Sequence, residues 1–499
     1  MECGLRWSVL LVLPILVLAS LVENASSTEY DFQVCEVTVK KWASSSMDEV
    51  KEDKHRLQDL LFFLHVPRTG GRSYYHCFLK KFYSSMLECP RSYDKLRFDP
   101  GKPNCRLLVT HDDYSVVSKL PKENTSVVTI MRNPIDRVFS TYEFSIEVAA
   151  RFLVHPNLTS ATTLSKRLRK KTGAISTLDI WPWKYLVPWM RQDLFARREA
   201  RMKKAQRHYH VNNSYNMEHM AMPLQKYIYD PIALDIVHNG ATFQVAGLTN
   251  NSYLAESHQV RHCVRKYQDL GKHVLEVAKR RLDNMLYVGL TEDHKESASL
   301  FGQVVGKQVM SQLEASNSTN EDLANERSEQ GPSLTDPELE SDHSPSGTDV
   351  NSSNMTSPEV DESTLKNMAT IGEVMEAYKV CITGLRKAES NRRYRSLAKI
   401  APANFTKEAR RKVSESVLRQ IEQLNSLDIE LYEYAKDIFA RQHKLVMHEF
   451  SEERLASIII DSSRLPSWTS VALAVVTFVL LLLLYFSVKV RRRTLKVKL

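Results

Sequence analysis

The chain has 499 residues, enough for one large domain or two, and its 43% hydrophobic and 25% charged content is that of a globular protein. This composition excludes a chain that is disordered or fibrous throughout. The formal net charge is +9, and it understates how basic the folded part is, because one segment collects many acidic residues.

The first predicted element is a secretory signal peptide in residues 1–27. Arg6 precedes the apolar core Trp7–Ala19, and small residues follow it. A bilayer span takes about 20 apolar residues, so this core is too short to be an anchor. We therefore expect cleavage after Ala19.

A core domain is predicted over residues 50–450. Short apolar and β-branched runs predict buried strands at 60–66, 106–111, 126–131, 242–248 and 285–290. Helical patterns separate these runs, as at 136–152 and 258–284. Strands that alternate with helices predict an α/β fold, with a central parallel sheet flanked by helices.

The run at 60–66 leads into the loop Val66-Pro67-Arg68-Thr69-Gly70-Gly71-Arg72-Ser73, which opens a predicted helix. Glycines let backbone N–H groups approach an anion, and a helix N-terminus and arginines add favourable charge. The spacing differs from the phosphate loop G-x-x-x-x-G-K-[ST]. A Gly-Gly pair after a strand can also be a plain turn, but the two arginines favour phosphate binding.

His111 ends the next predicted strand, in "LLVTHDDY". Ligands of parallel sheets bind beyond the carboxyl ends of strands, and an imidazole with a pKa near about 6.5 suits a general base. Asp112 or Asp113 is a candidate to orient the ring. The alternative interpretation is a solvent-exposed histidine in a turn.

The run at 126–131 ends at Arg132-Asn133-Pro134, and the helix after it carries Arg137 and Ser140. Arg132 at the strand tip and Ser140 two turns into the helix are expected to converge on one phosphate. The alternative is a capped helix with a surface salt bridge. Two cationic strand tips in one sheet predict a ligand with two separated phosphates.

Two segments beside the predicted site have more than one interpretation. The stretch "WPWKYLVPW" (181–189) either lines an aromatic acceptor groove or packs in the core. The stretch 191–210 has seven Lys or Arg and two acidic residues. It either attracts an acidic substrate or forms a solvated helix face.

The composition changes sharply at residues 312–363, where Ser, Asn, Thr, Pro and 13 acidic residues accompany a single basic residue, Arg327. Such a segment buries too little apolar surface to offset its ordering entropy, which predicts a disordered acidic insert in the core domain. Residues 413–446 then resume a helical pattern, with Leu418, Ile421, Leu431 and Ile438 on a common face.

The C-terminal end predicts a single membrane span. Residues 467–488 carry no charge and are long enough to cross a bilayer, and the basic tail 489–499 is expected to stay in the cytosol. This predicts a type I membrane protein whose domain is lumenal, which disfavours nucleic-acid binding. The alternative, a buried core helix, would not be apolar on every side.

Glycosylation acceptors and cysteines indicate the same compartment. Asn-x-Ser/Thr acceptors occur at Asn24, Asn124, Asn157, Asn212, Asn250, Asn317, Asn351, Asn354 and Asn404. Beyond the signal peptide six cysteines remain, an even number that suits disulfides. Cys89 with Cys105 is the expected pair. No C-x-x-C spacing or paired histidine cluster suggests a metal site, so no metal is expected.

The motifs "HVPRTGGRS" and "TIMRNPIDRVFS" together resemble the two nucleotide-binding signatures of membrane-associated sulfotransferases that use 3′-phosphoadenosine 5′-phosphosulfate (PAPS). The heparan sulfate 6-O-sulfotransferase branch is the most similar, and the likeness continues through 287–292 and 427–439. The resemblance implies a P-loop-like sulfotransferase fold and PAPS as the co-substrate. It requires no metal.

The resemblance also implies roles for individual residues. Residues Arg68, Thr69, Gly70, Gly71, Arg72 and Ser73 would hold the 5′-phosphosulfate, and Arg132 and Ser140 the 3′-phosphate. His111 matches the histidine that serves the family as general base. Arg68 stands where the family has Lys; a guanidinium is a poor proton donor, so its catalytic help would be electrostatic.

The arrangement of signal peptide, domain and C-terminal span resembles the plant-type tyrosylprotein sulfotransferases, whereas glycan 6-O-sulfotransferases typically have an N-terminal anchor. That resemblance implies transfer of a sulfuryl group to tyrosines next to Asp in secreted peptide precursors, in the Golgi. Two alternatives stay open: a glycan O-sulfotransferase, and a non-enzymatic membrane receptor or scaffold. Intact Arg68, His111, Arg132 and Ser140 disfavour the second alternative.

Overall fold

The computed structural model describes residues 29–47, 54–83, 87–90, 95–96, 98, 105–121, 124–155, 159–160, 163, 176–203, 214–318, 370–400, 403–463 and 467–496. The predicted signal peptide, 1–27, lies outside these residues. So does the predicted insert, 312–363, apart from its first residues, which complete helix α13 (Lys307–Ser318). The chain divides into two units, Met1–Ala440 and Arg441–Leu499.

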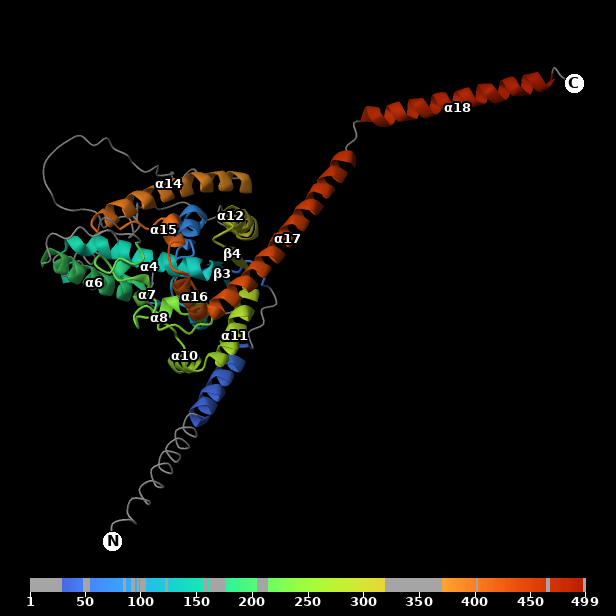
Figure 1. The fold of residues 1–499 in the computed structure, drawn as a ribbon. Coiled ribbons are helices and arrows are strands. Elements are labelled where there is room, and N and C mark those ends of the chain that lie inside the picture. The colour runs from blue at the N-terminus through green and yellow to red at the C-terminus, as the bar shows by residue number, and fades with distance from the viewer. Residues whose placement is uncertain are drawn as a thin grey trace, which may run out of the picture. The chain divides into compact units, whose positions relative to one another are not determined.

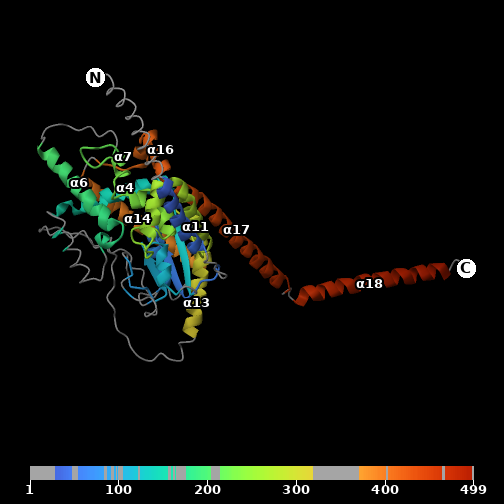
Figure 2. The same cartoon turned by 90° about the horizontal axis from the view of Figure 1, so that it is seen from below.

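Four parallel strands form the sheet of the first unit, in the order β2-β1-β3-β4. They are β1 (Leu60–Leu64), β2 (Leu107–Thr110), β3 (Thr125–Met131) and β4 (Tyr287–Leu290). Every strand residue is buried, which is why these segments are continuous apolar runs rather than alternating ones. Figure 2 shows the strands side by side, with helices around them. The predicted parallel α/β sheet is confirmed.

The strand order places a topological switch point between β1 and β3. The chain leaves β1 towards β2 on one side and leaves β3 towards β4 on the other. Ligands of open parallel sheets bind at the carboxyl ends of the strands at such a point. The loops that follow Leu64 and Met131 therefore meet at the edge where a ligand is expected.

Helix α4 (Pro134–Arg151) is the centre of the helical layer. It begins with Asn133 as its cap and Pro134 in its first turn, and nearly all of its residues are buried. It packs against α6 (Trp183–Lys203), α14 (Ile371–Ala398) and α16 (Glu415–Leu424). Figure 1 shows α4 and α6 side by side.

The other helices of the first unit are shorter, except for α17. They are α2 (Gly71–Tyr74), α3 (Lys80–Phe82), α7 (Leu224–Tyr227), α8 (Leu234–Val237), α9 (Gly240–Val245), α10 (Ser257–Lys266), α11 (Gly271–Asp283), α12 (His294–Phe301), α13, α15 (Lys407–Arg411) and the first part of α17 (Ser426–Ser463). A π-helical turn, Tyr75–Leu79, joins α2 to α3, so residues 71–82 form one helical stretch. Residues 29–47 are also helical.

One predicted strand, 242–248, is wrong: its first residues belong to helix α9. The carboxylate of Asp428 accepts hydrogen bonds from Ala241 N (3.2 Å), Thr242 N (2.7 Å) and Thr242 Oγ1 (2.7 Å), so it caps the first turn. Asp428 also pairs with buried Arg137 at 2.7 Å. These contacts come from the distant helix α17 and override the local β propensity.

Three disulfides tie the first unit together. Cys89 bonds Cys105, which confirms the predicted pair. Cys35 in the helix 29–47 bonds Cys263 in α10, and Cys77 in the π-helical turn bonds Cys381 in α14. Residues on both sides of the predicted insert are thus covalently joined within one unit.

The second unit contains the end of α17 and helix α18 (Ser467–Lys496). Within the part of the chain that the structure describes, one helix is long and apolar enough to cross a membrane, over Val471–Lys489. Its side chains are exposed along the whole segment. This helix coincides with the predicted span, 467–488, and is a candidate membrane anchor.

Candidate active site

The loop after β1 leaves the strand at Leu64 and enters the helical stretch 71–82. Arg68 and Gly70 have left-handed φ angles of 69° and 81°, which turn the chain sharply. The Thr69 hydroxyl donates to the Val66 carbonyl (2.8 Å), and the Thr69 carbonyl accepts from Thr291 Oγ1 (2.5 Å). The loop is therefore held both by its own hydrogen bond and by the residue that follows β4.

The two predicted phosphate-binding segments meet at Arg68. Its Nε donates to Ser140 Oγ at 3.0 Å, and its carbonyl accepts from Arg132 Nη1 at 3.0 Å. The guanidinium lies 4.3 Å from the centre of the Phe144 ring and makes a cation–π contact with it. Arg68, Arg132 and Ser140 are thus brought together at the switch point of the sheet.

The charge at this point suits an anion. Burial, and then the nearby charge of Arg68, lowers the pKa of Arg132. Arg132 Nε is buried and has no hydrogen-bond partner among the described residues. Two adjacent guanidiniums repel each other, and a buried unpaired donor is costly. A bound phosphate relieves both, so these residues fit one.

His111 follows β2 and is almost fully buried. Its Nδ1 lies 2.9 Å from the carbonyl oxygen of Trp181, and its Nε2 lies 3.0 Å from Nδ1 of His65. Both ring nitrogens therefore have hydrogen-bond partners, and these partners fix the orientation of the ring.

Neither of the two aspartates after His111 has the predicted role of orienting the ring. Asp112 accepts from Thr110 Oγ1 (3.0 Å) and Lys95 N (2.9 Å). Asp113 accepts from Thr249 N and Oγ1, each at 2.8 Å, and caps the short 3₁₀ helix that follows it. Burial raises the pKa of Asp113. Both carboxylates hold neighbouring loops together.

The remaining residues of the loop 66–73, the predicted donor loop, have different surroundings. Arg72 Nη1 donates to Glu389 Oε1 of α14 at 2.9 Å, a contact that the sequence did not suggest. Ser73 N donates to the Gly70 carbonyl at 3.0 Å. A Cβ atom on Gly71 would lie 2.5 Å from Cδ2 of His65, so only glycine fits against that ring.

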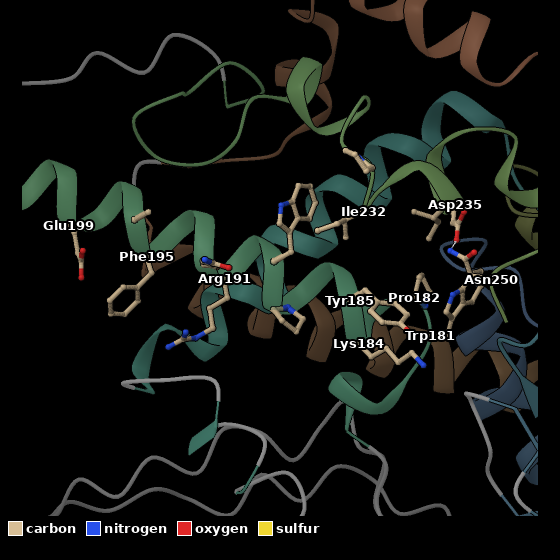
Figure 3. Close-up of a pocket in the computed structure, with 16 residues that line it drawn as sticks. Trp181, Pro182, Lys184, Tyr185, Arg191, Phe195, Glu199, Ile232, Asp235 and Asn250 are labelled. Carbon is tan, nitrogen blue, oxygen red and sulfur yellow. Dashed lines mark hydrogen bonds between the residues drawn. The ribbon is translucent and has the colours of Figure 1, made fainter. Parts of the chain in front are cut away.

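A groove with a volume of 760 Å³ follows helix α6 from Trp181 to Glu199. Its wall combines aromatic residues and prolines with charged and polar residues; the lining residues include Trp181, Pro182, Tyr185, Pro188, Trp189, Phe195, Lys184, Arg191, Glu199 and Asp235. Figure 3 shows Trp181 and Tyr185 towards one end of the groove and Phe195 towards the other. Trp181 also supplies the carbonyl that contacts His111, so the groove adjoins that residue.

Segment 181–189 thus both packs in the core and lines a groove, while its role towards an acceptor stays a prediction. Trp183, Leu186 and Val187 pack in the core. Other residues of the same helix, α6, line the groove. Parts of the basic stretch 191–210 are used internally: Arg191 Nε donates to the Phe152 carbonyl at 3.0 Å, and Arg197 pairs with Asp193. Residues 204–210 lie outside the described chain.

Three further residues of the site were not predicted. His65 contacts His111, and Thr291 holds the donor loop. Gln244 Nε2 donates to the carbonyls of His65 (3.2 Å) and His111 (2.9 Å), which fixes the ends of β1 and β2 relative to each other. A signal for His65 is present in the sequence, because the predicted strand 60–66 has His65 just before its last residue and the predicted strand 106–111 ends in His111.

Metal-ligating residues do not gather in this region. The described residues include no group of three or more His, Cys, Asp or Glu that could hold a metal ion.

Comparison with known proteins assigns the family. No protein-family model matches the chain. A protein-tyrosine sulfotransferase of Arabidopsis thaliana is 54% identical over 501 residues, an alignment that covers 98% of this chain and 98% of the relative. The chain belongs to the protein-tyrosine sulfotransferase family.

Proposed function

We propose that this protein transfers the sulfuryl group of PAPS to the phenolic oxygen of tyrosine in secreted peptide or protein precursors. The observation that carries the proposal is the convergence of Arg68, Arg132 and Ser140 at the β1–β3 switch point, close in the fold to the contact between His65 and His111. The 54% identity to a protein-tyrosine sulfotransferase supports tyrosine as the acceptor.

The donor has two separate anionic ends, and the site offers a place for each. Arg132 and Ser140 hold the 3′-phosphate, with Arg132 Nε as a buried donor that needs an acceptor. The turn from Arg68 to Ser73 holds the 5′-phosphosulfate through backbone N–H groups at the start of the helical stretch 71–82. Arg68 spans the two ends because its carbonyl contacts Arg132 and its side chain contacts Ser140.

The chain contributes to the reaction by charge neutralisation and proton removal. Arg68 stays charged at neutral pH and stabilises the charge on the sulfuryl oxygens and the leaving phosphate. His111 takes up the proton of the tyrosine hydroxyl as the new S–O bond forms. No metal is required by this scheme.

The groove of Figure 3 receives the acceptor peptide. Aromatic rings and prolines suit a segment that carries a tyrosine side chain, and Trp181 places one end of the groove beside His111. The groove wall carries both Lys184 and Arg191 and the acidic Glu199 and Asp235, and it is the net charge of +9 that favours the approach of acidic segments such as Asp-Tyr.

We further propose that the protein is a type I single-pass membrane protein of the Golgi, with its catalytic domain in the lumen. The candidate anchor at Val471–Lys489, the basic residues after it and three disulfides support this placement.

The test uses the full-length protein in detergent micelles with labelled PAPS and three acceptors: an Asp-Tyr peptide, the same peptide with Phe for Tyr, and a desulfated heparan-type glycan. We expect label on the tyrosine peptide alone. Label on the glycan alone would show that the protein is a glycan O-sulfotransferase, and label on neither would indicate a non-enzymatic protein.

Replacing His111 by Ala should abolish transfer and leave the affinity for the product 3′-phosphoadenosine 5′-phosphate nearly unchanged. If that affinity is lost as well, His111 holds the nucleotide and is not the base.

A further inference from the structure

Two imidazoles, those of His65 and His111, are in direct contact beside the donor loop. Leu64 and Thr110 are paired in the register of β1 and β2, so the residues that follow them emerge side by side. Nδ1 of His65 lies 3.0 Å from Nε2 of His111, and the ring centres are 4.4 Å apart with an interplanar angle of 86°.

The hydrogen bonds assign the protons of the neutral pair. The Trp181 carbonyl can only accept, so Nδ1 of His111 carries a proton. A neutral His111 then has its lone pair on Nε2, and Nδ1 of His65 must donate to it. A neutral His65 consequently has its own lone pair on Nε2.

The Nε2 edge of His65 faces the donor loop. A Cβ atom on Gly71 would lie 2.8 Å from this nitrogen and 2.5 Å from the adjacent Cδ2. A face of the ring stacks on Phe63, with centres 5.7 Å apart. The basic nitrogen of the pair that lies against the donor loop therefore belongs to His65, because the basic nitrogen of His111 is covered by His65.

We propose that His65 relays the proton of the acceptor hydroxyl to His111, an inference that rests on the proposed sulfotransferase function. The phenolic O–H gives its proton to Nε2 of His65 as the phenolic oxygen bonds to sulfur. The S–O bond to the donor phosphate breaks, and its electron pair leaves with 3′-phosphoadenosine 5′-phosphate. His65 passes its Nδ1 proton to Nε2 of His111, which becomes an imidazolium and returns the proton to solvent after product release.

The surroundings disfavour a positive charge that stays on His65. Burial, and then the charges of His111 and Arg68, lowers the pKa of His65 well below its usual value. The Trp181 carbonyl accepts from the His111 ring and stabilises its charged form. Gln244 donates to the carbonyls of both histidines and fixes the distance over which the proton moves.

Three substitutions of His65 separate a relay from a positioning role, each made in the full-length protein. His65→Asn places an amide N–H near Nδ1 and keeps the bond to His111, but it has no basic nitrogen. His65→Gln places an amide near Nε2 instead, and His65→Phe keeps only the ring. The exposed His258 provides a matched control as His258→Asn.

We expect each of the three variants to lower kcat for the Asp-Tyr peptide by about 100-fold or more. Binding of 3′-phosphoadenosine 5′-phosphate, measured by calorimetry, should stay within about 3-fold of the wild type, because the relay contacts only the transferred proton. In a fourth variant, His65→Ala, added imidazole should partly restore kcat, because it supplies the missing relay nitrogen. The His258→Asn control should match the wild type.

The outcomes distinguish this proposal from the proposed function. If His65→Asn keeps the wild-type kcat, His65 only positions His111, and the relay is wrong while His111 remains the base. If the His65 variants lose product binding, His65 builds the donor site, which also overturns the relay. If His111→Ala keeps full activity, the proposed general base is itself wrong, whatever the His65 variants show.

Discussion

Replacing Gly71 by Ala should disturb the histidine pair through a clash of known size. The added Cβ would lie 2.5 Å from Cδ2 and 2.8 Å from Nε2 of His65, and 3.0 Å from Cε1 of Phe63. Ordinary carbon contacts are about 3.5–4.0 Å, so the His65 ring must retreat by about 1 Å. Such a shift lengthens the 3.0 Å hydrogen bond to His111 beyond hydrogen-bonding distance.

The effect on stability should be small, while the effect on activity should be large. Overpacking costs about 1–3 kcal/mol, and alanine in a helix returns at most about 1 kcal/mol relative to glycine. The net loss in the free energy of unfolding is then about 0–2 kcal/mol. A displacement of about 1 Å in a catalytic group can lower the rate by about 100-fold, and we expect a loss of this size in kcat.

The assay measures kcat with labelled PAPS and the Asp-Tyr peptide, together with urea unfolding of the full-length protein in micelles. Gly384 in α14 is the control, because a Cβ there meets nothing within 4 Å. Gly384→Ala should keep kcat and slightly raise the free energy of unfolding. If Gly71→Ala keeps kcat within about 3-fold of the wild type, the contact between the donor loop and His65 does not control the reaction.

Three further predictions concern other parts of the domain. Asp428→Ala leaves buried Arg137 without its partner, so the free energy of unfolding in urea should fall by about 3–5 kcal/mol. The control, Glu430→Ala, breaks a surface ion pair and should lower the free energy of unfolding by less than about 1 kcal/mol. Equal losses in the two variants would contradict this account. Arg132→Ala should weaken 3′-phosphoadenosine 5′-phosphate binding by about 10-fold or more in calorimetry, whereas unchanged affinity would place the nucleotide elsewhere. Burial lowers the pKa of His294 to about 4, so the unfolded chain binds an extra proton between about pH 4 and 6.5, and the free energy of unfolding should increase as the pH rises through that range. His294→Gln should flatten this slope, and an unchanged slope would refute the assignment.

Much of the geometry of the candidate site was predictable because it depends on local patterns. Apolar runs that end in a glycine turn or in Arg-Asn-Pro mark the tips of buried parallel strands, and the strand order brings two such tips together. Arg68, Arg132 and Ser140 consequently meet as expected. The disulfide between Cys89 and Cys105 is local in the same sense, because only 16 positions separate the two residues.

The parts that were missed depend on contacts between distant segments. The carbonyl that contacts His111 belongs to Trp181, and Arg72 pairs with Glu389 across 317 positions. The predicted strand at 242–248 forms a helix instead because Asp428, far along the chain, caps its start. Periodicity and turn chemistry carry no information about such partners.

The bond between Cys77 and Cys381 has a consequence for proteolysis of this protein. It links the helical stretch behind the donor loop to α14, and the two cysteines lie on opposite sides of residues 319–369. A protease that cuts the chain once between those positions cannot release either fragment while the bond is intact. The nicked protein should migrate as one species on a non-reducing gel and as two after thiol treatment.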